Sequence, residues 1–274
     1  METKEGKKEM EKTGNGSAAK GNWAHLSGED WMYLLLHQPR FADKCDWSKL
    51  NGRDWMRLLL GQPQFAEHCD WSRLDGSDWV ELLKDRLQFA EHCDYGKLDG
   101  SDWARLLCSP NGLLFIEDCD FRKLDGSDWR MFVSVHPQYV EMMKPTDWDK
   151  LEGCDWASLL SEHVEFAEYC DWSKLDASDW HRLVSLRPEF AEKCDMSKFT
   201  GSDIVRLFRE RGRRPATGLC QRVGECDLST LTASNWCGIL ALRPDLADKF
   251  EASTHDWKAD EPALSEDEEA ALSD

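Results

Sequence analysis

Cysteine, histidine and aspartate recur at fixed spacing in this chain, and these residue types are well suited to chemistry. A histidine precedes a cysteine at His68-Cys69, and the same pair returns 24 residues later. Such a pair can bind a metal ion. The position of His68 is filled by Lys44 and by Tyr169 in other copies of the pattern. Because it accepts such different side chains, we interpret it as a tolerant, exposed position and not as a metal ligand.

The cysteines fit a buried apolar column better than a reactive site. Met143 and Phe250 take the same place in two copies of the pattern, and Cys, Met and Phe share a preference for burial. Neighbouring members should lie one repeat apart, beyond the ~7 Å between Cα atoms that a disulfide allows. We therefore predict free thiols in a reducing compartment of the cytosolic type. The column contains Cys45, Cys69, Cys93, Cys119, Cys170, Cys194 and Cys226.

The other cysteines show no metal-binding spacing. Cys108, Cys154, Cys220 and Cys237 are scattered and form no C-x-x-C pair. Cys220 and Cys226 can approach each other, but zinc would need two more ligands that we do not find. The sequence has no P-loop, G-x-S-x-G, H-E-x-x-H or Rossmann fingerprint. We therefore predict no metal, no cofactor, no catalytic residue and no enzymatic activity.

The charge balance excludes further classes of protein. The chain has 34 Lys and Arg against 53 Asp and Glu, a formal net charge of −19. This balance argues against non-specific binding to nucleic acid or to an anionic membrane. No run approaches the ~20 apolar residues of a transmembrane helix, and the first residues lack the apolar core of a signal peptide. We expect a cytoplasmic monomer with no membrane contact.

An internal repeat accounts for most of the 274 residues. The unit reads [GA]-x-D-W-x-x-L-L-x-x-x-P-x-F-A-x-x-C-D-W-S-K-L-x and recurs about nine times over residues 22–257. We expect residues 1–21 to be disordered, residues 206–224 to form a basic insertion, and residues 258–274 to be an acidic disordered tail. The units start near Asp30, Asp54, Asp78, Asp102, Asp128, Asp155, Asp179, Asp203 and Asn235.

All 14 tryptophans follow an aspartate or asparagine. These short side chains are strong helix N-caps, because they accept a hydrogen bond from a free N–H in the first turn. We predict that each repeat begins with a capped helix, and that the tryptophan anchors this helix on the same face as a Leu-Leu pair. The predicted anchors are Trp31, Trp55, Trp79, Trp103, Trp129, Trp156, Trp180 and Trp236.

A second helix follows in each repeat. A proline such as Pro63 predicts its start, since proline favours the first helical position. The next Asp-Trp predicts one more helical turn, and Asp-Gly or Asn-Gly predicts the link to the next repeat. No stretch alternates with period two, so we predict no significant sheet. Elements this short bury their apolar faces only by stacking, so the predicted fold is all-α: an α-solenoid, a superhelical rod of about nine two-helix repeats.

This pattern resembles the leucine-rich-repeat variant, an all-helical solenoid that alternates α- and 3₁₀-helices. The Leu-Leu pairs, such as Leu58-Leu59, and the proline at Pro63 carry the resemblance. The Asp-Trp signature and the cysteine column depart from it. The chain is more similar to bacterial arrays of the repeat FAxxCDWSKLxGxDWxxLL, over roughly residues 22–257. The resemblance implies an architecture and no particular activity.

Comparison among the repeats separates scaffold from surface. An acidic column, as at Glu67, and a basic column, as at Lys97, are charged in nearly every repeat, and we interpret them as solvated edges that pair locally. The column two residues after each first-helix tryptophan varies freely, so it is the better candidate for partner binding. It contains Tyr33, Arg57, Glu81, Arg105, Met131, Ser158, Arg182, Arg206 and Gly238, and the insertion adds Arg209, Arg211, Arg213 and Arg214.

Three functions are compatible with these features. The favoured one is a non-enzymatic scaffold or adaptor that binds a protein or peptide along the solenoid. The alternative is an acidic decoy that mimics nucleic acid and inhibits a basic nucleic-acid-binding protein, as its charge of −19 suggests. An enzyme with a site assembled across repeats is the least favoured, because the Asp-Trp aspartates already have capping roles. Direct nucleic-acid binding is expected, if at all, only through residues 206–224.

Overall fold

The computed structural model describes residues 22–209, 217–226, 228–241 and 243–252. In these residues the fold is all-α, as predicted, and no strand occurs. The chain divides into two compact units, residues 1–124 and 125–274. The predicted disordered start, the acidic tail and the central part of the basic insertion lie outside the described residues.

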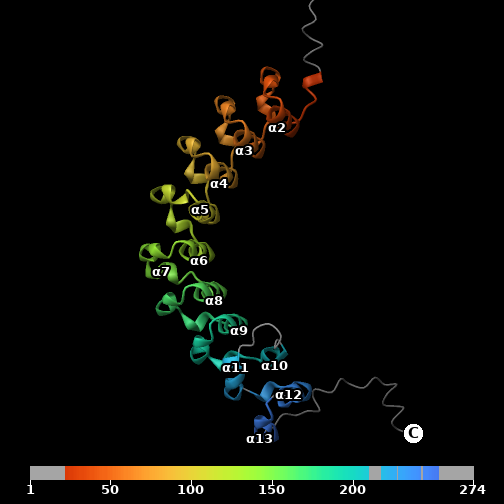
Figure 1. Ribbon diagram of the computed structural model, residues 1–274, viewed down its shortest axis with the longest axis vertical. Coiled ribbons are helices and arrows are strands. Elements are labelled where there is room, and N and C mark those ends of the chain that lie inside the picture. Colours follow the sequence, from red (N-terminus) through yellow and green to blue (C-terminus); the bar gives the residue numbers. More distant parts are fainter. Residues whose placement is uncertain (1–21, 210–216, 227, 242, 253–274) are drawn as a thin grey trace, which may run out of the picture. The chain divides into compact units, whose positions relative to one another are not determined.

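In the first unit, each repeat contains one α-helix, one longer 3₁₀-helix and one short 3₁₀ turn (Figure 1). The α-helices are α2 (Gly28–His37), α3 (Gly52–Gly61), α4 (Gly76–Asp85) and α5 (Gly100–Leu107). The longer 3₁₀-helices are η1 (Pro39–Lys44), η3 (Pro63–His68), η5 (Leu87–His92) and η7 (Gly112–Asp118). The short turns are η2 (Trp47–Lys49), η4 (Trp71–Arg73), η6 (Tyr95–Lys97) and η8 (Phe121–Lys123).

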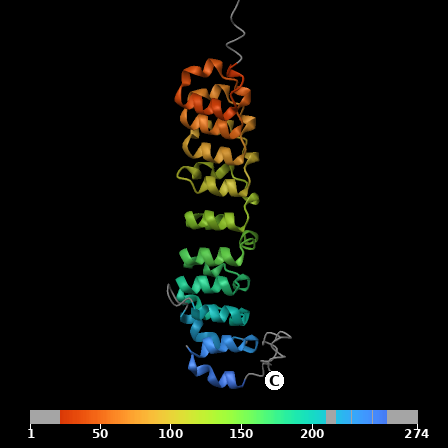
Figure 2. The ribbon, with the colours of Figure 1, turned by 90° about the vertical axis from the view of Figure 1, so that its right-hand side faces the viewer.

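The second unit repeats this order with insertions. Its α-helices are α6 (Gly126–Val135), α7 (Pro145–Trp148), α8 (Gly153–Glu162), α9 (Ala177–Leu186), α10 (Gly201–Arg209), α11 (Thr217–Arg222), α12 (Ala233–Leu240) and α13 (Ala247–Glu251). Its 3₁₀-helices are η9 (Pro137–Met142), η10 (Val164–Glu168), η11 (Trp172–Lys174), η12 (Pro188–Lys193), η13 (Met196–Lys198), η14 (Val223–Glu225), η15 (Leu228–Thr230) and η16 (Pro244–Leu246). Within each unit, neighbouring α-helices lie side by side (Figure 2).

The α-helices begin three residues earlier than we predicted. The aspartate before the helix tryptophan is not the N-cap but the third residue of the helix, and the cap is the residue before the glycine. In α3 the Asn51 side chain accepts a hydrogen bond from the Asp54 N–H, and the Asp54 carboxylate accepts one from the Asn51 N–H, at 2.9 and 3.1 Å. This reciprocal pair is a capping box, which satisfies two free donors at once. The same box begins at Ser27, Asn51, Asp75, Asp99, Asp125 and Asp176.

The second Asp-Trp of each repeat behaves as predicted. Asp70 is the N-cap of η4 and accepts hydrogen bonds from the Ser72 N–H and hydroxyl, at 3.2 and 2.6 Å. The Ser72 hydroxyl is the largest cause that lowers the pKa of Asp70 from its ordinary value. Short side chains that bond the backbone two residues ahead start such turns efficiently. The caps of this kind are Asp46, Asp70, Asp94, Asp120, Asp171 and Asp195.

The glycine that we assigned to a linking turn has a packing role instead. No described residue has a positive φ, so the glycine is not needed for a left-handed turn. Gly52 is the first residue of α3, and a Cβ there would collide with the Arg73 carbonyl of the next repeat and lie 2.5 Å from Oδ2 of Asp78. Glycine therefore lets consecutive repeats approach closely. Ala177 takes the same position in α9 and is buried.

The predicted tryptophan anchors form the core of the repeats. All eight are at most 1 % exposed. The tryptophan of the short turn is half-buried and stacks on the anchor of the next helix: the ring centroids of Trp47 and Trp55 are 5.4 Å apart. The indole nitrogen of Trp55 has no hydrogen-bond partner among the described residues. The indole thus acts through its volume and its ring contacts.

The cysteine column is less buried than we predicted, because its side chains sit at the ends of the 3₁₀-helices and not under the α-helices. Cys194 and Cys226 are buried, whereas Cys69 and its other counterparts are half-buried. The described cysteines are free thiols, as predicted. Burial raises the pKa of Cys69 to about 12, and the neighbouring Asp70 adds to the shift. A thiol with such a pKa is a poor nucleophile near neutral pH.

Candidate interaction surface

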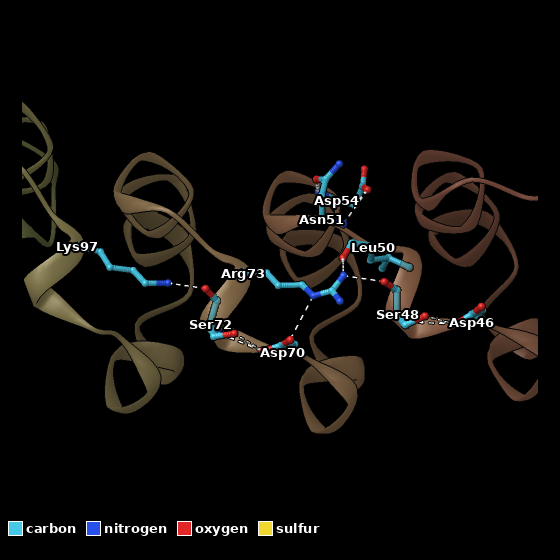
Figure 3. A network of polar contacts seen from close by, with 9 residues as sticks. All are labelled: Asp46, Ser48, Leu50, Asn51, Asp54, Asp70, Ser72, Arg73 and Lys97. Atoms are coloured by element: carbon cyan, nitrogen blue, oxygen red, sulfur yellow. Dashed lines mark hydrogen bonds and ion pairs between the residues drawn. The ribbon is translucent and has the colours of Figure 1, made fainter.

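The basic column binds the backbone of the preceding repeat. Lys97 Nζ donates to the carbonyls of Ser72 and Leu74, both at 2.6 Å. Arg73 Nη1 donates in the same way to Ser48 and Leu50, at 2.7 and 2.6 Å (Figure 3). We call this pair of bonds a stitch. Stitches are made by Lys49, Arg73, Lys97, Lys123, Lys174 and Lys198.

The stitch satisfies carbonyls that the local structure leaves free. A 3₁₀ turn of three residues ends with carbonyl groups that have no helical partner. In η4 these include the carbonyls of Ser72 and Leu74, and Lys97 satisfies both from η6 of the next repeat. A hydrogen bond from a charged donor is stronger than a neutral one. The basic column is therefore a structural element that fastens one repeat to the one before it.

The basic column is thus more than a solvated edge: Arg73 pairs locally with Asp70, as we expected of the column, and also binds carbonyls of the preceding repeat. Among the described residues, no ion pair joins the basic column to the acidic one. The basic side chains are bound to carbonyls, while the acidic side chains point to solvent: those of Glu67 and Glu91 are 77 % and 78 % exposed. The acidic column is thus a row of exposed carboxylates, and its ion pairs within the described residues are with adjacent residues, as at Asp43.

A second set of contacts fastens the other ends of the α-helices. After several of the helices, the next residue reaches back to a carbonyl near the end of the previous helix. Gln62 Nε2 donates to the Leu36 carbonyl at 3.0 Å, and Arg187 Nε donates to the Ser161 carbonyl at 2.9 Å. His163 Nε2 lies 2.9 Å from the Ser134 carbonyl. Both ends of the helices are therefore tied to the preceding repeat by polar side chains.

The histidine column stacks on tryptophan. The His92 ring lies over Trp71 of the preceding repeat, with centroids 4.4 Å apart and planes at 11°. Tyr169 stacks in the same way on Trp148, at 4.8 Å. Histidine and tyrosine share a flat face, which explains why this position accepts both. The position is exposed, as predicted, but it also has a packing role, because its side chain stacks on a tryptophan of the preceding repeat. No group of three or more His, Cys, Asp or Glu suited to a metal ion occurs in the described residues.

The variable column is only partly free for a partner. In the first unit Tyr33 is 64 % exposed and its ring lies 4.3 Å from that of His37. Arg57 is exposed, and its guanidinium makes no hydrogen bond or ion pair within the described residues. Glu81 and Arg105, by contrast, form an ion pair with a separation of 2.6 Å between neighbouring helices. We call Tyr33 and Arg57 the open pair.

Glu81 and Arg105 border an open depression of about 390 Å³ on α3, α4 and α5. Lys84 and Arg105 both bind Glu81, and they lower the pKa of its carboxyl. Asp78 lies in the same depression, where desolvation by burial raises its pKa. Most of the lining residues could not be identified from the sequence, because the packing of three helices brings them together. The lining residues are Arg53, Met56, Asp75, Ser77, Asp78, Glu81 and Arg105.

In the second unit the variable column is again divided. Arg182 is exposed, and no hydrogen bond or ion pair of its guanidinium occurs among the described residues. Met131 is half-buried. Arg206 donates to the Ser178 hydroxyl at 2.8 Å and lies 3.8 Å from the Asp203 carboxylate. The side chain of Arg209 and the residues Arg211, Arg213 and Arg214 lie outside the described part of the chain.

The comparisons with known proteins do not extend this picture. No family model, no curated protein and no solved structure matches the chain. In the residues that the structure describes, no helix is long and apolar enough to span a membrane. The fold and the surface define an all-α protein in which consecutive helices pack in a repeated pattern.

Proposed function

We propose that this chain is a non-enzymatic scaffold that binds a partner protein or peptide through its variable column, as a cytoplasmic monomer. The regular joints between its helices favour a solenoid of the type that the leucine-rich-repeat variant represents. Solenoids commonly bind extended partners along a surface of successive repeats. Tyrosine and arginine, the two residues of the open pair, are enriched among the residues that dominate binding energy at protein interfaces.

This proposal depends on one observation: some polar columns bind backbone groups of the scaffold, whereas part of the variable column does not. The basic column is bound to carbonyls, and the capping aspartates are bound to backbone N–H groups. Arg57 and Arg182 make no such bond within the described residues. Side chains that the scaffold does not use are the ones that a partner can select.

Affinity purification from the native host tests the proposal. The double variant Tyr33→Ala/Arg57→Glu should lose the partner that the native chain retains at high salt, while its circular dichroism stays helical. Arg105→Glu is unsuitable, because it would place a carboxylate beside Glu81. Lys44→Glu is the matched control, because Lys44 is an exposed cation paired only with its neighbour Asp43. If the double variant and the control retain the partner equally, the open pair is not the binding site.

The acidic decoy remains a second candidate, and the exposure of the acidic column favours it. The alternation of acidic and basic columns along the sequence weighs against this function, since nucleic acid carries charge of one sign. The Lys97 ammonium keeps its charge but is directed at carbonyls of the preceding repeat, whereas the carboxylates of Glu67 and Glu91 are 77 % and 78 % exposed and accessible to a basic protein. A decoy would compete with DNA for a basic protein, and high salt would abolish the competition. A partner that stays bound at high salt instead supports the scaffold.

A further inference from the structure

We call the contact between two consecutive repeats a joint. The joint between α10 and α12, in the second unit, lacks its stitch. The short turn η15 (Leu228–Thr230) aligns with η13 (Met196–Lys198), so Thr230 stands where the preceding repeat has Lys198. Threonine carries neither an ammonium nor a guanidinium group. The basic donor of the stitch is therefore absent from the sequence at this position.

The carbonyls that the missing donor would bind are in place. Lys198 Nζ donates to the Ser173 carbonyl and, at 2.9 Å, to the Leu175 carbonyl. The corresponding groups one repeat later are the carbonyls of Ser197 and Phe199. In the part of the chain that the structure describes, no hydrogen bond reaches either of these oxygens. A backbone carbonyl that has no donor within the protein can accept a hydrogen bond from an external one.

A pocket of about 410 Å³ opens at this place, between the first residues of α10 and of α12. Its lining offers hydroxyl and amide oxygens from Ser202, Thr232 and Asn235, and it includes the buried residue Phe199. Lys198 contributes to the lining, but its ammonium is bound at the preceding repeat. The complete lining is Ser197, Lys198, Phe199, Thr200, Gly201, Ser202, Thr232 and Asn235.

We propose that this pocket, the vacant stitch socket, binds a primary ammonium or guanidinium group from outside the array. At the other joints the same two carbonyls hold a lysine or arginine nitrogen at hydrogen-bond distance. The pocket repeats that arrangement of acceptors. The source is the side chain of a lysine or arginine on a partner, or a free polyamine. This inference does not rest on the proposed scaffold function.

Calorimetric titration of the full chain tests the socket. Nα-acetyl-lysine methylamide and spermidine should each bind saturably at one site, while tetramethylammonium, which has no N–H donor, should not bind. Tighter binding of the lysine derivative assigns the socket to a partner side chain, and tighter binding of spermidine assigns it to a free polyamine. Binding of tetramethylammonium at equal strength, or no binding of either amine, would overturn the proposal.

Two variants separate the socket from non-specific attraction to an acidic protein. Thr230→Lys should fill the socket from within and abolish binding, while the control Thr230→Ser should leave binding unchanged. Lys97→Ala, which empties the stitch between η4 and η6, should raise the number of amine sites from one to two. This second variant keeps the test valid if Thr230→Lys fails to fold. Equal binding by the native chain, Thr230→Lys and Lys97→Ala would contradict the proposal.

Discussion

Two joints can be compared: the one between α4 and α5, and the one between α10 and α12. They differ in the side chain at the position of the stitch. Both joints pack neighbouring α-helices around a buried leucine and a buried tryptophan: Leu98 and Trp103 in the first, Leu231 and Trp236 in the second. The first joint has its stitch from Lys97, and the second has Thr230 at that position. Apolar burial is thus common to both joints, and the stitch is an addition that one of them lacks.

This difference teaches that position, and not charge, decides what a basic residue does here. Lys97 and Lys44 are both lysines of the first unit. Lys97 binds two carbonyls of the preceding repeat, whereas Lys44 is exposed and pairs with the adjacent Asp43 at 2.7 Å. Exposed ion pairs of the second kind contribute little to stability. Substitutions at the two positions should therefore have unequal effects.

The largest effect is expected where the repeats approach most closely. Gly52→Ala places a Cβ against the Arg73 carbonyl, so the two repeats must separate and the stitch from Arg73 must lengthen. Overpacking costs about 1–3 kcal/mol of the free energy of unfolding, and we expect the upper part of this range because the joint after Gly52, unlike the one at Ala177, has not been built around a methyl group. Urea denaturation followed by circular dichroism measures this loss. A change below about 0.5 kcal/mol, the usual range for a neutral surface substitution, would show that the joint has room for a methyl group.

A glycine whose Cβ would meet no atom of another repeat serves as the control. Gly96 stands where other repeats have serine, and a Cβ there would lie 3.0 Å from Oδ1 of its own neighbour Asp94. In the serine-containing repeats this hydroxyl donates to the capping aspartate, as Ser72 does to Asp70 at 2.6 Å. Gly96→Ser should therefore leave the free energy of unfolding unchanged or raise it slightly. A large loss of stability would mean that the joint is sensitive to any added atom.

A smaller effect is expected for the stitch itself. Lys97→Met keeps most of the apolar stem but removes the ammonium, so the first joint becomes like the second. The loss should be about 1–2 kcal/mol, because hydrogen bonds to charged groups are worth roughly that much when partly exposed to water. Lys44→Met should change stability by less than about 0.5 kcal/mol. If both variants lose the same amount, the stitch contributes nothing beyond an ordinary surface charge.

The sequence predicted the elements better than the contacts between them. The tryptophan anchors, the short turns capped by Asp70 and its counterparts, and the absence of sheet from the described residues follow from local chemistry that the repeat displays many times. The N-cap was misassigned because an aspartate before a tryptophan fits a cap and also fits the third position of a capping box. The residue before Gly52, with an acidic residue three places on, was the signal that distinguishes the two.

The stitches were not predictable, because their acceptors are invisible in a sequence. A column such as Lys97 shows a conserved charge among the repeats but not the backbone oxygens 23 and 25 residues earlier that receive it. The pairing of Glu81 with Arg105 and the depression beside it likewise depend on the offset between neighbouring helices. The sequence does show that Thr230 replaces the basic residue of the column. That this replacement removes a stitch follows only when the contacts at the other joints are known.

The central claim is that the basic side chains of the column are bound to carbonyls and are not free in solvent. Acetylation of the folded chain with an N-hydroxysuccinimide ester, followed by mass spectrometry, measures this for every lysine at once. Lys49, Lys97, Lys174 and Lys198 should react about tenfold more slowly than Lys44, the protection that ~1.4 kcal/mol provides. Equal rates at Lys97 and Lys44 in the folded chain would contradict the account.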